Sequence, residues 1–160
     1  MKKADLELQE KRELTSPKFN PNEWEMFLKA GCYQYAMDWK MDEFFLIGKL
    51  LGKECKSYTQ TELLIFTLMK ELKSLYYEVE ITEPEVKAKE GEKKIYLQYF
   101  PSIGTYHLLR EDDDGIWSHK YPRELPLRVD AKKQIIKNPE LMSDNFPFIG
   151  WCFLLKRGMS

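Results

Sequence analysis

The chain has 160 residues, of which 43% are hydrophobic, 14% aromatic and 32% charged. This length and apolar content allow one domain with a sizeable core and argue against disorder. The formal net charge is -1, with acidic and basic residues interspersed, so we expect no nucleic-acid partner. No apolar run is long enough to cross a bilayer, and the N-terminus lacks the apolar stretch of a signal peptide. Three widely spaced cysteines then predict free thiols and a cytoplasmic protein.

We expect residues 1–17 to form a charged N-terminal arm and residues 18–160 to form a single domain. A helix is predicted from Cys32 to about Lys40. Its apolar residues recur at helical spacing and mark one buried face: Tyr35, Ala36 and Trp39. The apolar stretch over residues 43–52 that follows is predicted to be helical or turn-like.

A second helix is predicted after Thr59-Gln60-Thr61-Glu62, which has the form of a capping box. Its core side carries leucines at helical spacing: Leu64, Leu68, Leu72 and Leu75. Strands are predicted over residues 77–81, 94–100 and 148–155, and in the two arms of a hairpin between the last two. Helices followed by antiparallel strands predict an α+β fold, with the N-terminal helices packed on the sheet.

The two histidines of the chain, His107 and His119, flank an acidic turn that ends in Gly115. Glycine supplies the positive φ that such loops need. Pairing of Arg110 with Ile116 would place His107 directly opposite His119, and paired residues of antiparallel strands point to the same face. We therefore expect two imidazoles side by side on one face of a hairpin, next to a solvated acidic turn.

Cys32 is predicted in the first turn of a helix, where unpaired backbone N–H groups and the helix dipole favour a thiolate. The thiolate is a nucleophile, His107 is the candidate to hold and deliver its proton, and His119 the candidate to orient His107. The backbone N–H of Cys32 and a hydroxyl of Tyr33 or Tyr35 are candidates for an oxyanion hole. The structural alternative for a cysteine is a buried apolar residue.

Two parts of the chain resemble a known family. Asn20-Pro21-Asn22-Glu23-Trp24 and Gly31-Cys32-Tyr33-Gln34-Tyr35-Ala36 resemble the Asn-Pro-x-x-Trp and Asn-Cys-Tyr-x-Tyr-Ala motifs of an NlpC-like group of bacterial and phage papain-fold cysteine peptidases and amidases. The hairpin, from Tyr106-His107 through Gly115-Ile116-Trp117-Ser118-His119-Lys120, resembles the Tyr-His and Gly-x-Trp-Ser-His-Lys motifs of the same group.

The resemblance covers about residues 18–156 and implies a papain-like fold with a Cys–His–His triad that cleaves a peptide or other amide bond. It makes Cys32 the nucleophile, His107 the base and His119 the orienting third member. The chain departs from the pattern twice. Gly31 stands where the group has asparagine, and Tyr121 follows Lys120 where the group has proline.

The alternative function is a catalytically silent papain-like module that binds a protein partner. Aromatic residues expected near the cleft would serve binding as well as catalysis: Tyr33, Tyr35, Trp39, Trp117 and Tyr121. A further alternative is a zinc site of Cys32, His107 and His119, with Cys152 as an additional ligand. The sequence has no short pair of ligands such as Cys-x-x-Cys, so we expect neither metal nor cofactor.

Overall fold

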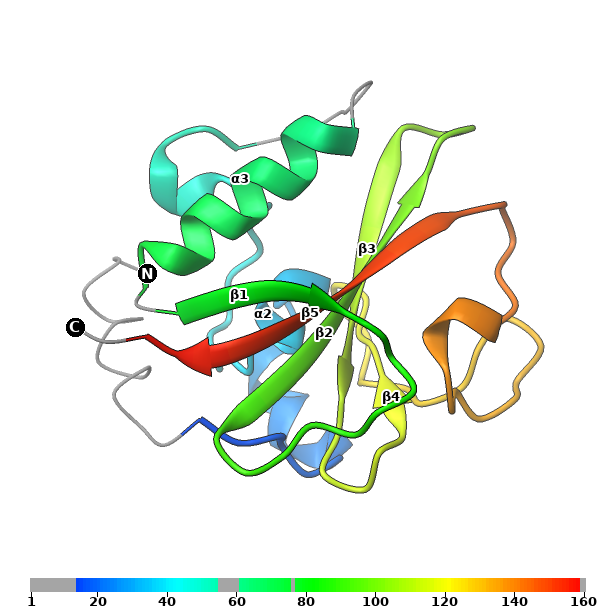
Figure 1. The fold of residues 1–160 in the computed structure, drawn as a ribbon. Helices are drawn as coiled ribbons and strands as arrows, with labels where there is room; N and C mark the ends of the chain where they lie inside the picture. Colours follow the sequence, from blue (N-terminus) through cyan, green and yellow to red (C-terminus); the bar gives the residue numbers. More distant parts are fainter. Residues whose placement is uncertain (1–13, 55–60, 76, 159–160) are drawn as a thin grey trace.

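The structure is a computed structural model that describes residues 14–54, 61–75 and 77–158. Five antiparallel strands form one twisted sheet in the order β1-β5-β2-β3-β4 (Figure 1). The strands are β1 (Tyr77–Thr82), β2 (Glu92–Phe100), β3 (Thr105–Glu111), β4 (Trp117–Ser118) and β5 (Ile149–Arg157). The α+β class and the antiparallel sheet are thereby confirmed.

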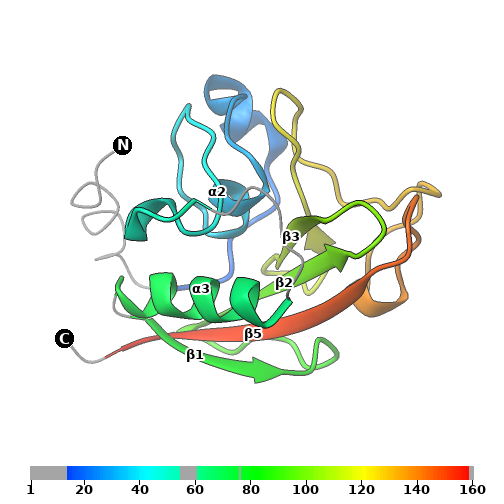
Figure 2. The same ribbon diagram turned by 90° about the horizontal axis from the view of Figure 1, so that it is seen from above.

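Two α-helices pack against this sheet, α2 (Cys32–Ala36) and α3 (Thr61–Lys73). Figure 2 shows α3 running along the sheet above β1 and β5, while α2 lies farther along the same side and contacts β3. Three short 3-10 helices complete the described elements: Pro21–Phe27, Lys49–Leu51 and Pro139–Leu141. No helix in the described ranges has the length and apolar character needed to span a membrane.

The core lies between α3 and the sheet. The four leucines predicted to face the core, at positions 64, 68, 72 and 75, are fully buried there. They pack with apolar residues of the central strands β2, β3 and β5. Two predicted features fall outside the described residues: residues 1–13 of the N-terminal arm and the start of the capping box at Thr59-Gln60.

The helix that carries Cys32 is shorter than predicted. It ends at Ala36, because Asp38 adopts a positive φ of 59° that a helix cannot contain. The Asp38 carboxylate is held in this turn by Lys40 and Arg110. The Trp39 side chain nevertheless packs in the core, and the backbone N–H of Trp39 donates to the backbone carbonyl of Gln34 at 2.8 Å. The predicted buried face is therefore formed partly by a helix and partly by a turn.

The hairpin register differs from the predicted one by two residues. β3 and β4 pair Arg110 with Ser118, whereas the sequence predicted Arg110 opposite Ile116. Because the shift is even, each side chain keeps its face of the sheet. His107 and His119 consequently stay on one face, as diagonal rather than directly opposite neighbours.

The reason for the shift is that Asp112 is buried and does not belong to a solvated turn. Its carboxylate accepts hydrogen bonds from Arg110 Nε at 2.9 Å and from Arg128 at 3.1 Å. These pairs extend β3 to Glu111 and move the loop toward β4. Of the acidic turn, Asp113 and Asp114 remain exposed, and Asp114 also pairs with Arg128.

We expect Asp112→Ala to lower the free energy of unfolding by about 3–5 kcal/mol, because the change leaves a buried guanidinium without its carboxylate. Asp113→Ala is the matched control and should change stability by less than about 0.5 kcal/mol, because Asp113 is exposed. Urea unfolding followed by circular dichroism measures both. Equal stability of the two variants would contradict a structural role for the pair.

Candidate active site

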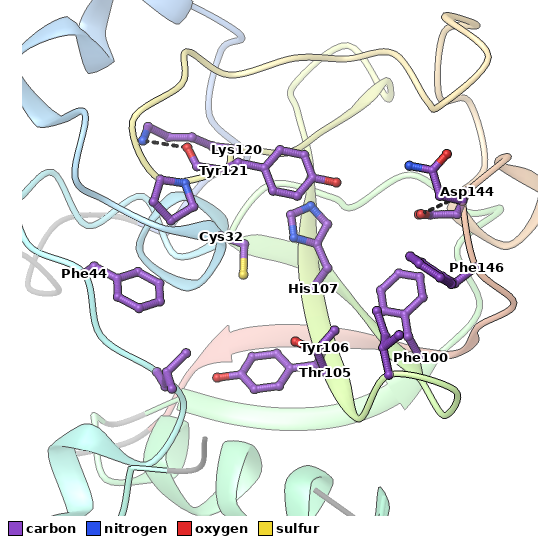
Figure 3. Close-up of a pocket in the computed structure, with 14 residues that line it drawn as sticks. Cys32, Phe44, Phe100, Thr105, Tyr106, His107, Lys120, Tyr121, Asp144 and Phe146 are labelled. Carbon is purple, nitrogen blue, oxygen red and sulfur yellow. Dashed lines mark hydrogen bonds between the residues drawn. The ribbon is translucent and has the colours of Figure 1, made fainter. Parts of the chain in front are cut away.

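A cavity of about 370 Å³ opens beside the N-terminus of α2, between this helix and β3. Cys32 and His107 both line it, and Figure 3 shows the sulfur of Cys32 next to the His107 ring. His119 is buried behind His107 and does not line the cavity. The three predicted triad residues therefore meet at one place, with the first two facing the cavity and the third behind them.

Cys32 begins α2, directly after the buried Gly31. The Gly31 N–H donates to Gln34 Oε1 at 2.8 Å, and Gln34 Nε2 donates to the Phe45 carbonyl at 3.0 Å. A Cβ at position 31 would lie 2.6 Å from the Phe44 ring. The glycine that departs from the family pattern thus leaves room for Phe44, which lines the cavity.

The two histidines form a hydrogen-bonded chain that ends on a backbone carbonyl. His107 Nε2 lies 2.9 Å from His119 Nδ1, and His119 Nε2 lies 2.9 Å from the carbonyl oxygen of Val129. Val129 was not among the predicted site residues. Only its carbonyl takes part, and a backbone group leaves no signal in the residue type.

This chain determines where the protons lie. A carbonyl only accepts, so neutral His119 must carry its proton on Nε2 and offer Nδ1 as an acceptor. His107 must then donate through its own Nε2, which leaves its Nδ1 without a proton. The resulting lone pair of Nδ1 is what a general base requires.

Backbone contacts fix the position of His119 and its carbonyl partner. His119 and Leu127 exchange two backbone hydrogen bonds, of 2.8 and 2.9 Å. The Asp130 carboxylate accepts from the N–H groups of Lys132, Gln134 and Ser143, and these bonds lower the pKa of Asp130. The segment that presents the Val129 carbonyl is therefore held on both sides.

The unliganded site holds a neutral pair, which differs from the sequence-based expectation. Burial raises the pKa of Cys32 to about 11, against the opposing effect of backbone N–H groups of Leu108, Cys32 and Tyr33. Burial, with a smaller effect of His119, lowers the pKa of His107 to about 3. The N–H groups at the start of α2 act in the predicted direction, but burial outweighs them, so the expected thiolate is not favoured in this state. No hydrogen bond joins Cys32 to His107 in the part of the chain that the structure describes.

Tyr121, the second departure from the family pattern, covers His107. The two rings are stacked with centroids 4.6 Å apart and an interplanar angle of 10°. Tyr121 also contacts the edge of His119, at 5.4 Å between centroids. It lines the cavity, so its ring forms a wall of the site and limits the motion of His107.

Lys120 joins the two sides of the site. Its buried ammonium donates to the carbonyls of Leu28 and Ala30, just before Cys32, and to the carbonyl of Tyr121 at 3.3 Å. Burial lowers the pKa of Lys120 to about 8. The Lys120 ammonium thus connects the segment that precedes Cys32 to the segment that follows His119.

The other predicted cleft residues do not reach the cavity. The Tyr33 hydroxyl donates to Glu71 at 2.6 Å, and the Tyr35 hydroxyl lies 2.7 Å from Ser118 Oγ. Trp39 and Trp117 are fully buried in the core. Neither tyrosine hydroxyl can act as an oxyanion donor there, which leaves the backbone N–H of Cys32 as the candidate.

The zinc alternative receives no support from the geometry. Among the described residues, the group of metal-ligating side chains that lie within reach of one another is the exposed set Glu83, Glu85 and Glu140. Cys152 is buried in β5 within a separate apolar cluster, together with Trp117. Both ring nitrogens of His119 are already used in hydrogen bonds.

We expect ¹⁵N NMR of histidine-labelled protein to show both imidazoles neutral and protonated on Nε2 at about pH 8, because burial lowers both pKa values. His107 should stay neutral down to about pH 5, since its pKa is lowered to about 3. A proton on Nδ1 of His107 would contradict the assigned direction of the hydrogen-bond chain.

We expect Tyr121→Ala to raise the pKa of His107 from about 3 toward its ordinary value of about 6.5, because the ring that excludes water is removed. Tyr121→Phe is the matched control and should leave the pKa unchanged. The same NMR titration measures both, and equal behaviour of the two variants would show that the stacked ring does not shield His107.

Comparisons of the chain with protein-family models, with curated proteins and with solved structures found no match. The function is therefore inferred from the chemistry of the cavity and of the residues around it.

Proposed function

We propose that the protein is a papain-like cysteine hydrolase that cleaves an amide bond in a peptide or other amide-linked substrate. The observation that carries this proposal is the chain from Val129 through His119 to His107, which leaves an unprotonated nitrogen on an imidazole beside the Cys32 thiol. A helix with the cysteine, followed by antiparallel strands with the histidines, is also the order expected of an NlpC-type papain fold. The proposed place of action is the cytoplasm.

The reaction begins with a neutral thiol and a neutral imidazole. His107 Nδ1 takes the Cys32 proton while the sulfur attacks the scissile carbonyl, and His119 stabilises the imidazolium through the existing hydrogen bond. The backbone N–H of Cys32 stabilises the negative charge that develops on the carbonyl oxygen. His107 then delivers the proton to the leaving amine, and a thioester remains on Cys32.

Water completes the cycle. His107 accepts a proton from the water molecule that attacks the thioester, and returns it to the sulfur when the carboxylic acid leaves. No cofactor is required, because the same imidazole acts as base and then as acid in each of the two halves of the reaction. His119 keeps His107 in the required tautomer throughout and transfers no proton itself.

The alternative is a papain-like module that binds a protein partner without turnover. The observation that favours it is the raised pKa of Cys32, together with the missing hydrogen bond between its thiol and His107 in the described residues. Catalytic hydrogen bonds are often long in unliganded enzymes and shorten when substrate binds, so hydrolysis remains the better-supported proposal.

The test is acylation of the protein by p-nitrophenyl acetate. Release of p-nitrophenolate measures the rate, and mass spectrometry of each cysteine peptide identifies the acetylated residue. We expect an acetyl thioester on Cys32 and continued turnover. His107→Ala should lower the rate by about 10²–10⁴-fold, and His119→Ala by less, because it orients rather than transfers. Cys152→Ala is the control and should retain activity.

A folded protein whose Cys32 is not acetylated, or is acetylated equally in His107→Ala, would contradict the hydrolase proposal. The binding module would then be favoured, and Cys32→Ala would retain full affinity for its partner.

A further inference from the structure

The walls of the cavity beside Cys32 are predominantly apolar. They include three aromatic side chains from separate segments, Phe44, Phe100 and Phe146 (Figure 3). Ile103 from the β2–β3 turn also lines the cavity. The volume of about 370 Å³ falls in the range of about 300–1,000 Å³ that is common for ligand sites. It is large enough for an aromatic or branched side chain.

Several of these apolar side chains remain open to solvent. Phe44 is 53% exposed, Ile103 48% and Phe146 45%. Burial of such apolar surface by a ligand group is favourable. A ligand that covers these exposed apolar side chains beside Cys32 would therefore gain binding free energy.

The charges around the cavity disfavour an acidic ligand. Lys120 is the lysine that lines it, and its ammonium already donates to the carbonyls of Leu28, Ala30 and Tyr121. Asp144 lines the opposite part, and no lysine or arginine of the described residues pairs with its carboxylate. A substrate carboxylate would meet an apolar wall and the like charge of Asp144, while the Lys120 ammonium already uses its three donors on backbone carbonyls.

We propose that this cavity binds a bulky, uncharged apolar group next to the scissile carbonyl, so that the substrates are amides with an aromatic or branched aliphatic group there. This inference rests on the proposed hydrolase function and names its substrate class. Phe44 and Phe146 determine the specificity, and Asp144 excludes acidic groups.

Gly31 has a direct part in this specificity. Its missing Cβ lets the Phe44 ring pack within 2.6 Å of where that atom would lie, which brings the ring to the edge of the cavity beside Cys32. A larger residue at position 31 would displace the ring. The departure from the family asparagine is thus explained by the apolar wall.

The test compares N-acetylated amino-acid chloromethyl ketones that carry phenylalanine, leucine or glutamate. In each, the Cys32 sulfur displaces chloride and forms a thioether, so the second-order rate constant reports binding beside the nucleophile. We expect the phenylalanine and leucine probes to react at least about tenfold faster than the glutamate probe. An equal or faster glutamate probe would overturn the inference.

Matched variants assign the preference to the cavity. Phe44→Ala and Phe146→Ala should lower the ratio of the phenylalanine to the glutamate rate severalfold, and Asp144→Asn should lower it by speeding the glutamate probe. Phe66→Ala is the control, because Phe66 is exposed on α3 outside the cavity. An unchanged ratio in all three cavity variants would overturn the assignment.

A binding measurement separates this inference from the hydrolase proposal. Cys32→Ala protein is titrated with N-acetyl-phenylalanine amide and N-acetyl-glutamate amide, and shifts of cavity residues are followed by NMR. We expect the phenylalanine ligand to bind at least about tenfold more tightly. If Cys32 fails the acylation test and this preference persists, catalysis is refuted and the apolar site stands. If acylation occurs and the preference is absent, the apolar site is refuted.

Discussion

The buried pair of Arg110 and Asp112 connects the elements that carry the candidate site. Arg110 follows His107 on β3 by three residues, and its guanidinium lies 3.8 Å from the Tyr35 ring of α2, the helix that begins with Cys32. Asp112 holds Arg110 and also Arg128, which precedes the carbonyl of Val129. Nucleophile, base and the end of the hydrogen-bond chain are therefore positioned by one set of charges. Because these charges are buried, a small displacement of any element would leave one of them without its partner.

The burial that makes the site rigid also makes it neutral at rest. In the proposed reaction, a neutral thiol and imidazole cannot react until the proton moves, so the interactions that would matter for catalysis are those that stabilise the imidazolium. The hydrogen bond that His107 donates to Nδ1 of His119 is such an interaction. It strengthens when His107 becomes charged, so in the proposed reaction it would lower the barrier more than it stabilises the resting state.

Elements with a regular spacing of apolar residues could be predicted from the sequence. Contacts between segments that are distant in the sequence could not. The leucine spacing of α3 and the alternation of the strands gave the α+β class, and a register error of two residues left both histidines on the predicted face. The tyrosines beside Cys32 illustrate the limit. A five-residue helix directs Tyr33 to Glu71 and Tyr35 to Ser118, away from the cavity, and nothing near these residues in the sequence indicates these partners. The role of the Val129 carbonyl could not be predicted either, because every residue has a backbone carbonyl.

The two departures from the family pattern have their effects at the same cavity, although they lie far apart in the chain. Gly31 makes room for Phe44 on one side of Cys32, and Tyr121 covers His107 on the other. A bulky apolar wall on one side and a stacked ring on the other both exclude water from the thiol. Exclusion of water raises the cost of a thiolate, but in the proposed reaction it would strengthen every hydrogen bond to the charged intermediate once a substrate fills the cavity. An apolar substrate group would complete that exclusion, which makes substrate shape and the acid–base chemistry of Cys32 and His107 parts of one constraint.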